Sequence, residues 1–165
     1  MEVKESDCYD TPKWATKAIV KYLPKGCKIW EPFAGNRCMS KVLIKNGFKV
    51  RESEIQWDEK MDFFHYQPKK DFDVIVSNPP YSVLNKVMQR IHENEWKYFL
   101  LVPVYVLGSQ GRYDIFKDEG VNIYLFREKV NFLKGGAETN GAPFFTVWAS
   151  NVPYDNELDR IIYLD

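Results

Sequence analysis

The chain has 165 residues, 45% of them hydrophobic, and this length and composition suit one compact domain with a full core. Lysine and arginine number 23 and so do aspartate and glutamate, so the formal charge of zero argues against a protein that attracts nucleic acid with its whole surface. The three cysteines form no Cys-x-x-Cys pair and no stretch is long and apolar enough to cross a bilayer, so we expect no disulfide framework, no metal site and no membrane association.

The first half of the chain alternates between helix and strand patterns. Thr11-Pro12 is typical of a helix start, with threonine as the N-cap and proline at the first helical position. Residues 28–33 then predict a strand, and Ala34-Gly35-Asn36 predicts the turn that follows it. Residues 37–46 predict a second helix, and residues 48–55 predict a second strand.

The second half starts with the same alternation and ends with strands only. The predicted elements are a strand at 72–76, a helix at 83–91, a strand at 98–102, a helix at about 109–118, and strands at 121–126, 144–149 and 160–164. This order predicts an α/β domain that spans residues 1–165. Its central sheet is mostly parallel, with helices on both faces and an antiparallel C-terminal portion. Ligands bind such sheets at the carboxyl ends of the strands.

The end of the first predicted strand carries an acidic residue and a glycine turn. Glu31 precedes Gly35 in the turn, where a glycine lets the backbone approach a ligand closely. Glu54 follows at the end of the second strand, where a carboxylate can accept hydrogen bonds from two ribose hydroxyls. The alternative interpretation is an ordinary strand-to-helix turn with a solvated Glu54.

The end of the strand at 72–76 carries the most distinctive motif, Asn78-Pro79-Pro80-Tyr81. The prolines fix the backbone and leave their carbonyls as acceptors, while the tyrosine ring can stack on a flat group. Two acceptors aimed at an exocyclic amine draw its lone pair out of the aromatic ring and stabilise the positive charge that develops on nitrogen during alkylation. The motif therefore favours amine methylation over a purely structural turn.

On these motifs the chain resembles the S-adenosylmethionine-dependent amino-methyltransferases, above all the DNA N6-adenine methyltransferases of phage and viral type. The resemblance implies the Rossmann-like class I methyltransferase fold, S-adenosylmethionine as cofactor, DNA as the nucleic-acid partner, no metal, and a cytoplasmic location, or a nuclear one in a eukaryotic host. It assigns catalysis to Asn78, Pro79, Pro80 and Tyr81. It assigns cofactor binding to Thr11, Pro12, Trp14, Glu31, Phe33, Ala34, Gly35, Glu54, Ile55, Asp62, Phe63 and Asn78, with Glu31 at the methionine ammonium. It also places Tyr81 and Phe132 at the target base.

Two departures from this family pattern bear on function. Arg37 stands where the family usually has a second glycine, and a side chain there is expected to narrow the cofactor site. Only residues 151–165 follow the last motif, so we expect no separate target-recognition domain. A protein partner that supplies recognition, a nonspecific enzyme and an enzyme for single strands all fit this pattern.

Further polar residues and alternative functions stay open at this point. Arg112 is a candidate phosphate contact, and the glycine-rich residues 135–141 suit either a lid over the site or a plain surface loop. The expected reaction is methyl transfer to the 6-amino group of adenine in DNA. The alternatives are an RNA or protein glutamine amine methyltransferase, and an inactive binding subunit with the same fold.

Overall fold

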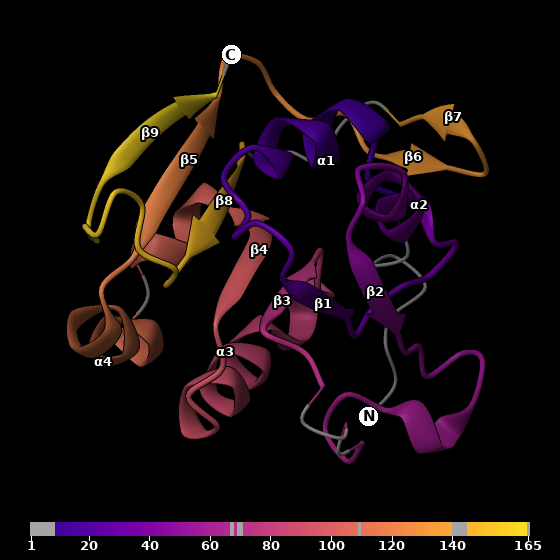
Figure 1. The fold of residues 1–165 in the computed structure, drawn as a ribbon, viewed down its shortest axis with the longest axis horizontal. Coiled ribbons are helices and arrows are strands. Elements are labelled where there is room, and N and C mark those ends of the chain that lie inside the picture. Colours follow the sequence, from indigo (N-terminus) through magenta and orange to yellow (C-terminus); the bar gives the residue numbers. More distant parts are fainter. Residues whose placement is uncertain (1–8, 67, 69–70, 109, 140–144, 165) are drawn as a thin grey trace.

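The computed structural model describes residues 9–66, 68, 71–108, 110–139 and 145–164, which form an α/β domain around a seven-stranded sheet (Figure 1). The strand order is β2-β1-β3-β4-β8-β5-β9. Every neighbouring pair is parallel except those of β8, which runs antiparallel to both β4 and β5. The bounds are β1 Lys28–Glu31, β2 Lys49–Glu52, β3 Val74–Ser77, β4 Tyr98–Pro103, β5 Asn122–Phe126, β8 Thr146–Ser150 and β9 Ile161–Leu164. The predicted mostly parallel sheet with an antiparallel C-terminal portion is confirmed.

Helices cover both faces of the sheet. In Figure 1, α1 and α2 lie on one face, and α3 and α4 lie on the other. Their bounds are α1 Lys13–Val20, α2 Cys38–Lys45, α3 Leu84–Glu93 and α4 Gln110–Glu119. Two apolar clusters fill the space beneath them: one contains Ile19 and Leu43 from the first pair, and the other contains Met88 and Ile115 from the second. Within the described residues, each helix is too short or too polar to cross a membrane.

Fully buried apolar strands set the centre of this fold. All side chains of β3, β4 and β8 are buried, as expected for strands that are covered on both faces. In the parallel register, Trp30 of β1 pairs with Ile75 of β3, and Glu31 pairs with Glu52 of β2. The carboxyl ends of β1, β2 and β3 therefore meet at one edge, which brings Glu54 and Asn78 together.

Two local predictions differ from the structure. Thr11 does not cap α1: Pro12 occupies the N-cap position, the helix begins at Lys13, and no side chain caps it. The predicted loop at 135–141 is partly a hairpin, because β6 Leu133–Lys134 pairs with β7 Ala137–Glu138. Both turn glycines, Gly135 and Gly136, have positive φ, as a two-residue hairpin turn requires. Residues 109, 140, 141 and 144 of the predicted elements lie outside the described residues.

Within the described ranges, short 3-10 helices lie near the carboxyl edge. They are η2 Glu59–Met61, η3 Tyr81–Val83 and η4 Val104–Gly108. The middle one joins β3 to α3, so the Asn78 turn leads directly into a helix that packs on the sheet. This short connection ties the position of Asn78 to that of α3.

Candidate active site

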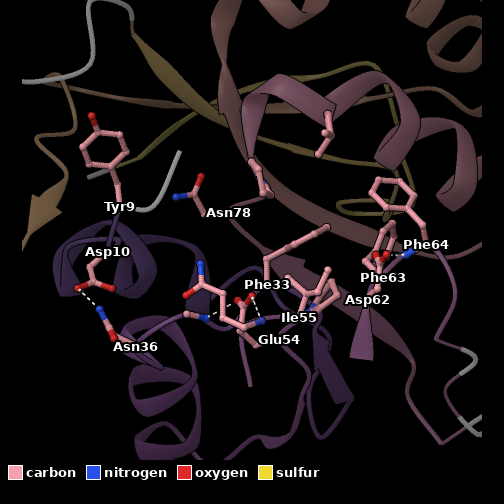
Figure 2. A pocket seen from close by; sticks show the side chains of 15 residues that line it. Tyr9, Asp10, Phe33, Asn36, Glu54, Ile55, Asp62, Phe63, Phe64 and Asn78 are labelled. Carbon is pink, nitrogen blue, oxygen red and sulfur yellow. Dashed lines mark hydrogen bonds between the residues drawn. The ribbon is translucent and has the colours of Figure 1, made fainter. Parts of the chain in front are cut away.

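A cleft opens at the carboxyl edge of β1, β2 and β3 (Figure 2). Four sequence-distant segments meet there: the residues before α1, the turn after β1, the stretch that follows β2, and the turn after β3. The lining residues are Tyr9, Asp10, Pro32, Phe33, Gly35, Asn36, Glu54, Ile55, Gln56, Asp62, Phe63, Phe64, Asn78, Pro80 and Val83.

The glycine turn after β1 forms the floor of the cleft and is held by Glu54. Gly35 has φ +48°, and its backbone N–H donates to Glu54 Oε2 at 2.9 Å. A second backbone N–H, from Gln56, donates to Glu54 Oε1 at 3.3 Å. The carboxylate is only 7% exposed, but each oxygen keeps a further lone pair for a ligand hydroxyl. Two N–H donors thus orient Glu54 for the ribose contact expected of it.

Glu31 lies deeper than the sequence analysis expects. It is 3% exposed, is not among the cleft-lining residues, and accepts a short hydrogen bond from the Ser40 hydroxyl of α2. The pKa of Glu31 is raised to about 8, chiefly by burial; the hydrogen bond from Ser40 opposes this rise, and the negative charges of Glu52 and Glu54 contribute to it. The free protein therefore holds a proton on this carboxyl group at neutral pH. Its expected contact with a ligand ammonium stays a prediction.

The far end of the cleft is an aromatic wall made by residues 62–64. Figure 2 places Asp62, Phe63 and Phe64 together at one end, with Ile55 and Phe33 between them and Asn78. Asp62 Oδ1 accepts the Phe64 N–H at 3.0 Å, which closes a tight local turn. The Phe63 ring is 2% exposed and lies 5.0 Å from the Phe33 ring, centroid to centroid. A flat apolar surface beside a carboxylate suits a heterocycle with an amino group.

The opposite end of the cleft is formed by the segment before α1. Asp10 exchanges two backbone hydrogen bonds with Leu133 of β6, each 2.9 Å long. Its carboxylate accepts from the Asn36 side-chain amide at 3.1 Å, as Figure 2 shows beside Tyr9. Together these bonds fix Tyr9 and Asp10 over the glycine turn. Tyr9, Asp10 and Asn36 line the cleft but are not among the site residues predicted from the sequence. Of the three, only Asp10 had a signal in the sequence, because it directly precedes Thr11-Pro12.

Asn78 stands where β3 ends and faces the cleft near Tyr9 and Phe33 (Figure 2). Its Oδ1 atom is buried and has no hydrogen-bond partner among the described residues. A buried acceptor without a donor is costly, and this oxygen is therefore available to a donor on a ligand. Pro79 is buried behind it, and Tyr81 is half-buried with its ring against the apolar cluster beneath α1 and α2. The turn is thus a rigid corner with an open acceptor.

Arg37 leans away from the cleft. It has φ 62°, the left-handed conformation, and its backbone N–H closes the turn by donating to the Ala34 carbonyl at 2.7 Å. Its guanidinium lies 4.3 Å from the centre of the Trp57 ring and 3.3 Å from Glu52. The expectation that this side chain narrows the cofactor site is therefore wrong, because arginine adopts the backbone shape of glycine here and projects outward.

Other predicted site residues lie apart from the cleft. Thr11, Pro12 and Ala34 are buried outside its lining, and Trp14 packs edge-on against Phe126 of β5. Their roles stay predictions.

Two predicted substrate contacts are not accessible in this arrangement. Phe132 is 3% exposed and packs against Tyr9 and the core. Arg112 is 7% exposed, donates its Nε–H to the Val106 carbonyl at 2.8 Å, and also bonds Asn85. A phosphate contact does not fit Arg112, because its donors are already directed into the protein.

Comparisons with known proteins agree with this geometry. The family described as Eco57I restriction-modification methylase matches residues 25–141, which include the turn after β1, Glu54, Asp62 and Asn78. Among solved structures, the chain is similar to a class I S-adenosylmethionine-dependent methyltransferase from Listeria monocytogenes. The two are 14% identical with a TM-score of 0.50, over 98% of this chain and 67% of that chain. A protein from Agrobacterium tumefaciens described as an O-methyltransferase is 12% identical with a TM-score of 0.46, over 92% of this chain and 84% of that chain. No curated protein sequence matches the chain significantly.

Proposed function

Because the chain belongs to the Eco57I restriction-modification methylase family, we propose that it transfers a methyl group from S-adenosylmethionine to the 6-amino group of adenine in DNA. The observation that carries the proposal is the buried Oδ1 atom of Asn78 at the edge of the cleft, which has no hydrogen-bond partner in the part of the chain that the structure describes. Methyl transfer is the chemistry of the family, and the position and type of this acceptor support an amine as the group that is methylated.

The residues that line the cleft fit the cofactor. Glu54 offers free lone pairs to the ribose hydroxyls, and the wall of Asp62 and Phe63 suits the adenine ring. The methionine end would lie toward the turn at Gly35, where Asp10 supplies negative charge near an ammonium and buried Glu31 would supply it after releasing its proton. When bound, S-adenosylmethionine supplies an electrophilic methyl group on a sulfonium.

The corner at Asn78 would act on the acceptor amine. Its Oδ1 would accept one N–H of the amine and the Pro79 carbonyl would accept the other, which draws the nitrogen toward a tetrahedral geometry. The lone pair would then be free to attack the methyl carbon as its bond to sulfur breaks, with S-adenosylhomocysteine as the leaving group. The same acceptors would stabilise the positive charge on nitrogen until one N–H proton is lost to solvent. Tyr81 would stack on the base and hold its amine in line with the methyl group, after the base has flipped out of the DNA double helix.

DNA adenine is favoured over the other amines by the family match, since restriction-modification methylases act on DNA. An inactive binding subunit is disfavoured by Arg37, whose outward lean leaves the cleft open. An amine in RNA or a glutamine in a protein would bind at the same corner. The test must therefore distinguish which of these substrates receives the methyl group.

The test is methylation of DNA in cells that express the chain or its Asn78→Ala variant, read by sequencing of modified bases. We expect N6-methyladenine with the wild type only. In vitro, Asn78→Ala should lose about 10²–10³-fold in turnover while its affinity for S-adenosylhomocysteine stays within a few-fold, because the acceptor acts chiefly in the transition state. Methyl incorporation into RNA or into a glutamine-containing peptide, with none into DNA, would overturn the proposed acceptor.

A further inference from the structure

The aromatic wall of the cleft depends on a loop with little regular structure. Residues 62–66 follow η2, and their internal backbone hydrogen bonds run to the Asp62 carbonyl, which accepts from the N–H groups of His65 at 2.9 Å and Tyr66 at 2.7 Å. This turn leaves the carbonyls of Phe63 and Tyr66 pointing toward the protein interior. The position of Asp62 and Phe63 in the cleft therefore depends on whatever holds those two carbonyls.

Arg90 of α3 holds both of them. Its Nη1 donates to the Phe63 carbonyl, and its Nη2 donates to the Tyr66 carbonyl at 2.9 Å. The guanidinium carbon lies 5.2 Å from the centre of the Phe63 ring and 5.4 Å from that of Trp96, so aromatic faces flank the charge. The residue is 8% exposed, although its charge is costly to bury.

This buried cation is not explained by an ion pair. Among the described residues Arg90 forms no salt bridge, and Asp62 and Glu93 act on it only through their nearby charge. A methionine would fill the same space between Phe63 and Trp96 without the cost of burying a charge. What an apolar side chain lacks is the planar pair of donors that reaches two carbonyls at once.

We propose that Arg90 is a positioning residue, which clamps the loop at residues 62–66 so that Asp62 and Phe63 meet the adenine ring of the cofactor. The inference rests on the proposed function only in taking the cleft to hold S-adenosylmethionine. Arg90 itself is not among the lining residues and acts through the loop.

The experiment measures ligand affinity by titration calorimetry on Arg90→Met and Arg90→Lys. The probes are S-adenosylhomocysteine and 5′-methylthioadenosine, which lacks the methionine end. We expect Arg90→Met to weaken both ligands about tenfold, the equivalent of one lost charge-assisted hydrogen bond, with turnover at saturating cofactor within a few-fold of wild type. Arg90→Lys should restore part of the affinity, since an ammonium can reach one carbonyl.

Arg112 offers a matched control for general effects on stability. Like Arg90, it is a buried arginine on a helix, and it donates to a backbone carbonyl. Unlike the loop that Arg90 holds, its partners are not among the residues that line the cleft. Arg112→Met should unfold at lower urea concentration and bind both ligands as the wild type does. Equal affinity losses in Arg112→Met and Arg90→Met, or unchanged affinity in Arg90→Met, would overturn the inference.

The two ligands separate this inference from the proposed function. A loss confined to S-adenosylhomocysteine, with 5′-methylthioadenosine unaffected, would place the effect of Arg90 at the methionine end and overturn the inference. Failure of the wild type to methylate DNA would overturn the proposed acceptor only, because the affinity measurements involve no acceptor. If Arg90→Met does not fold, the affinities of the soluble Arg90→Lys variant decide the matter, and wild-type values there would refute the clamp.

Discussion

The sharpest stability prediction concerns the buried carboxyl group of Glu31. Replacement by glutamine keeps the shape and the oxygen that accepts the Ser40 hydroxyl bond but removes the titration. The pKa of Glu31 rises from its ordinary value of 4.5 to about 8, with burial as the first cause. The folded protein therefore binds this proton more tightly than the unfolded chain does, so the stabilisation is complete below pH 4.5 and is lost as pH rises through 8.

The size of the effect follows from the gap between the two pKa values. Each pH unit inside this window corresponds to about 1.4 kcal/mol, so the free energy of unfolding of the wild type should fall by about 3 kcal/mol between pH 5.5 and pH 7.5 relative to Glu31→Gln. Other titrating groups are common to both proteins and cancel in the difference.

Urea unfolding of the ligand-free proteins at several pH values measures this difference directly. The free energy of unfolding of Glu31→Gln should increase steadily relative to that of the wild type as pH rises. At pH 8, Glu31→Gln should be the more stable protein. A difference between the two that does not change from pH 5.5 to pH 8 would refute the reasoning, because it would mean that Glu31 is ionised in the fold throughout.

Two further predictions concern the turn after β1, and a third concerns Glu31 at the end of that strand. Gly35→Ala should lower the free energy of unfolding in urea by about 1 kcal/mol, because φ at this position is +48°. The same change should weaken S-adenosylhomocysteine binding in calorimetry, because it moves the N–H group that orients Glu54. Unchanged affinity would contradict this. Arg37→Gly should change the stability by less than about 1 kcal/mol, because relief of the left-handed backbone offsets the lost contact with Trp57, and a tenfold gain in cofactor affinity would contradict the outward lean. Calorimetry in buffers of different ionisation enthalpy should detect close to one proton released per S-adenosylhomocysteine bound at pH 7, and none with Glu31→Gln; equal release by both proteins would rule out Glu31 as the partner of the ammonium.

The central strands β3, β4 and β8 were predictable from the sequence because their side chains are buried on both faces. Short, continuous apolar runs such as those at β3 and β4 are typical of buried parallel strands. The hairpin of β6 and β7 was not predictable in the same way. Each of its strands has two residues, too few for a periodic pattern, and Gly135-Gly136 suits a loop as well as a tight turn.

The site was predictable where it follows from strand ends. Glu54 and Asn78 both line the cleft because parallel strands bring their carboxyl ends to one edge. The places of Asp10 and Arg90 depend on contacts between distant segments, with Leu133 and with Phe63, and no local pattern encodes such contacts. Arg112 was misjudged for the same reason, since only the fold reveals that an internal carbonyl engages its guanidinium.

The conformation of Arg37 has a consequence for how such loops are recognised in other sequences. What the bend requires is a positive φ and nothing protruding into the ligand space, and both conditions are met by a long side chain that finds partners on the outer surface, here Glu52 and Trp57. A search that insists on a second glycine would pass over chains of this kind. One that instead looks for an acid and an aromatic residue able to receive the displaced cation would retain them.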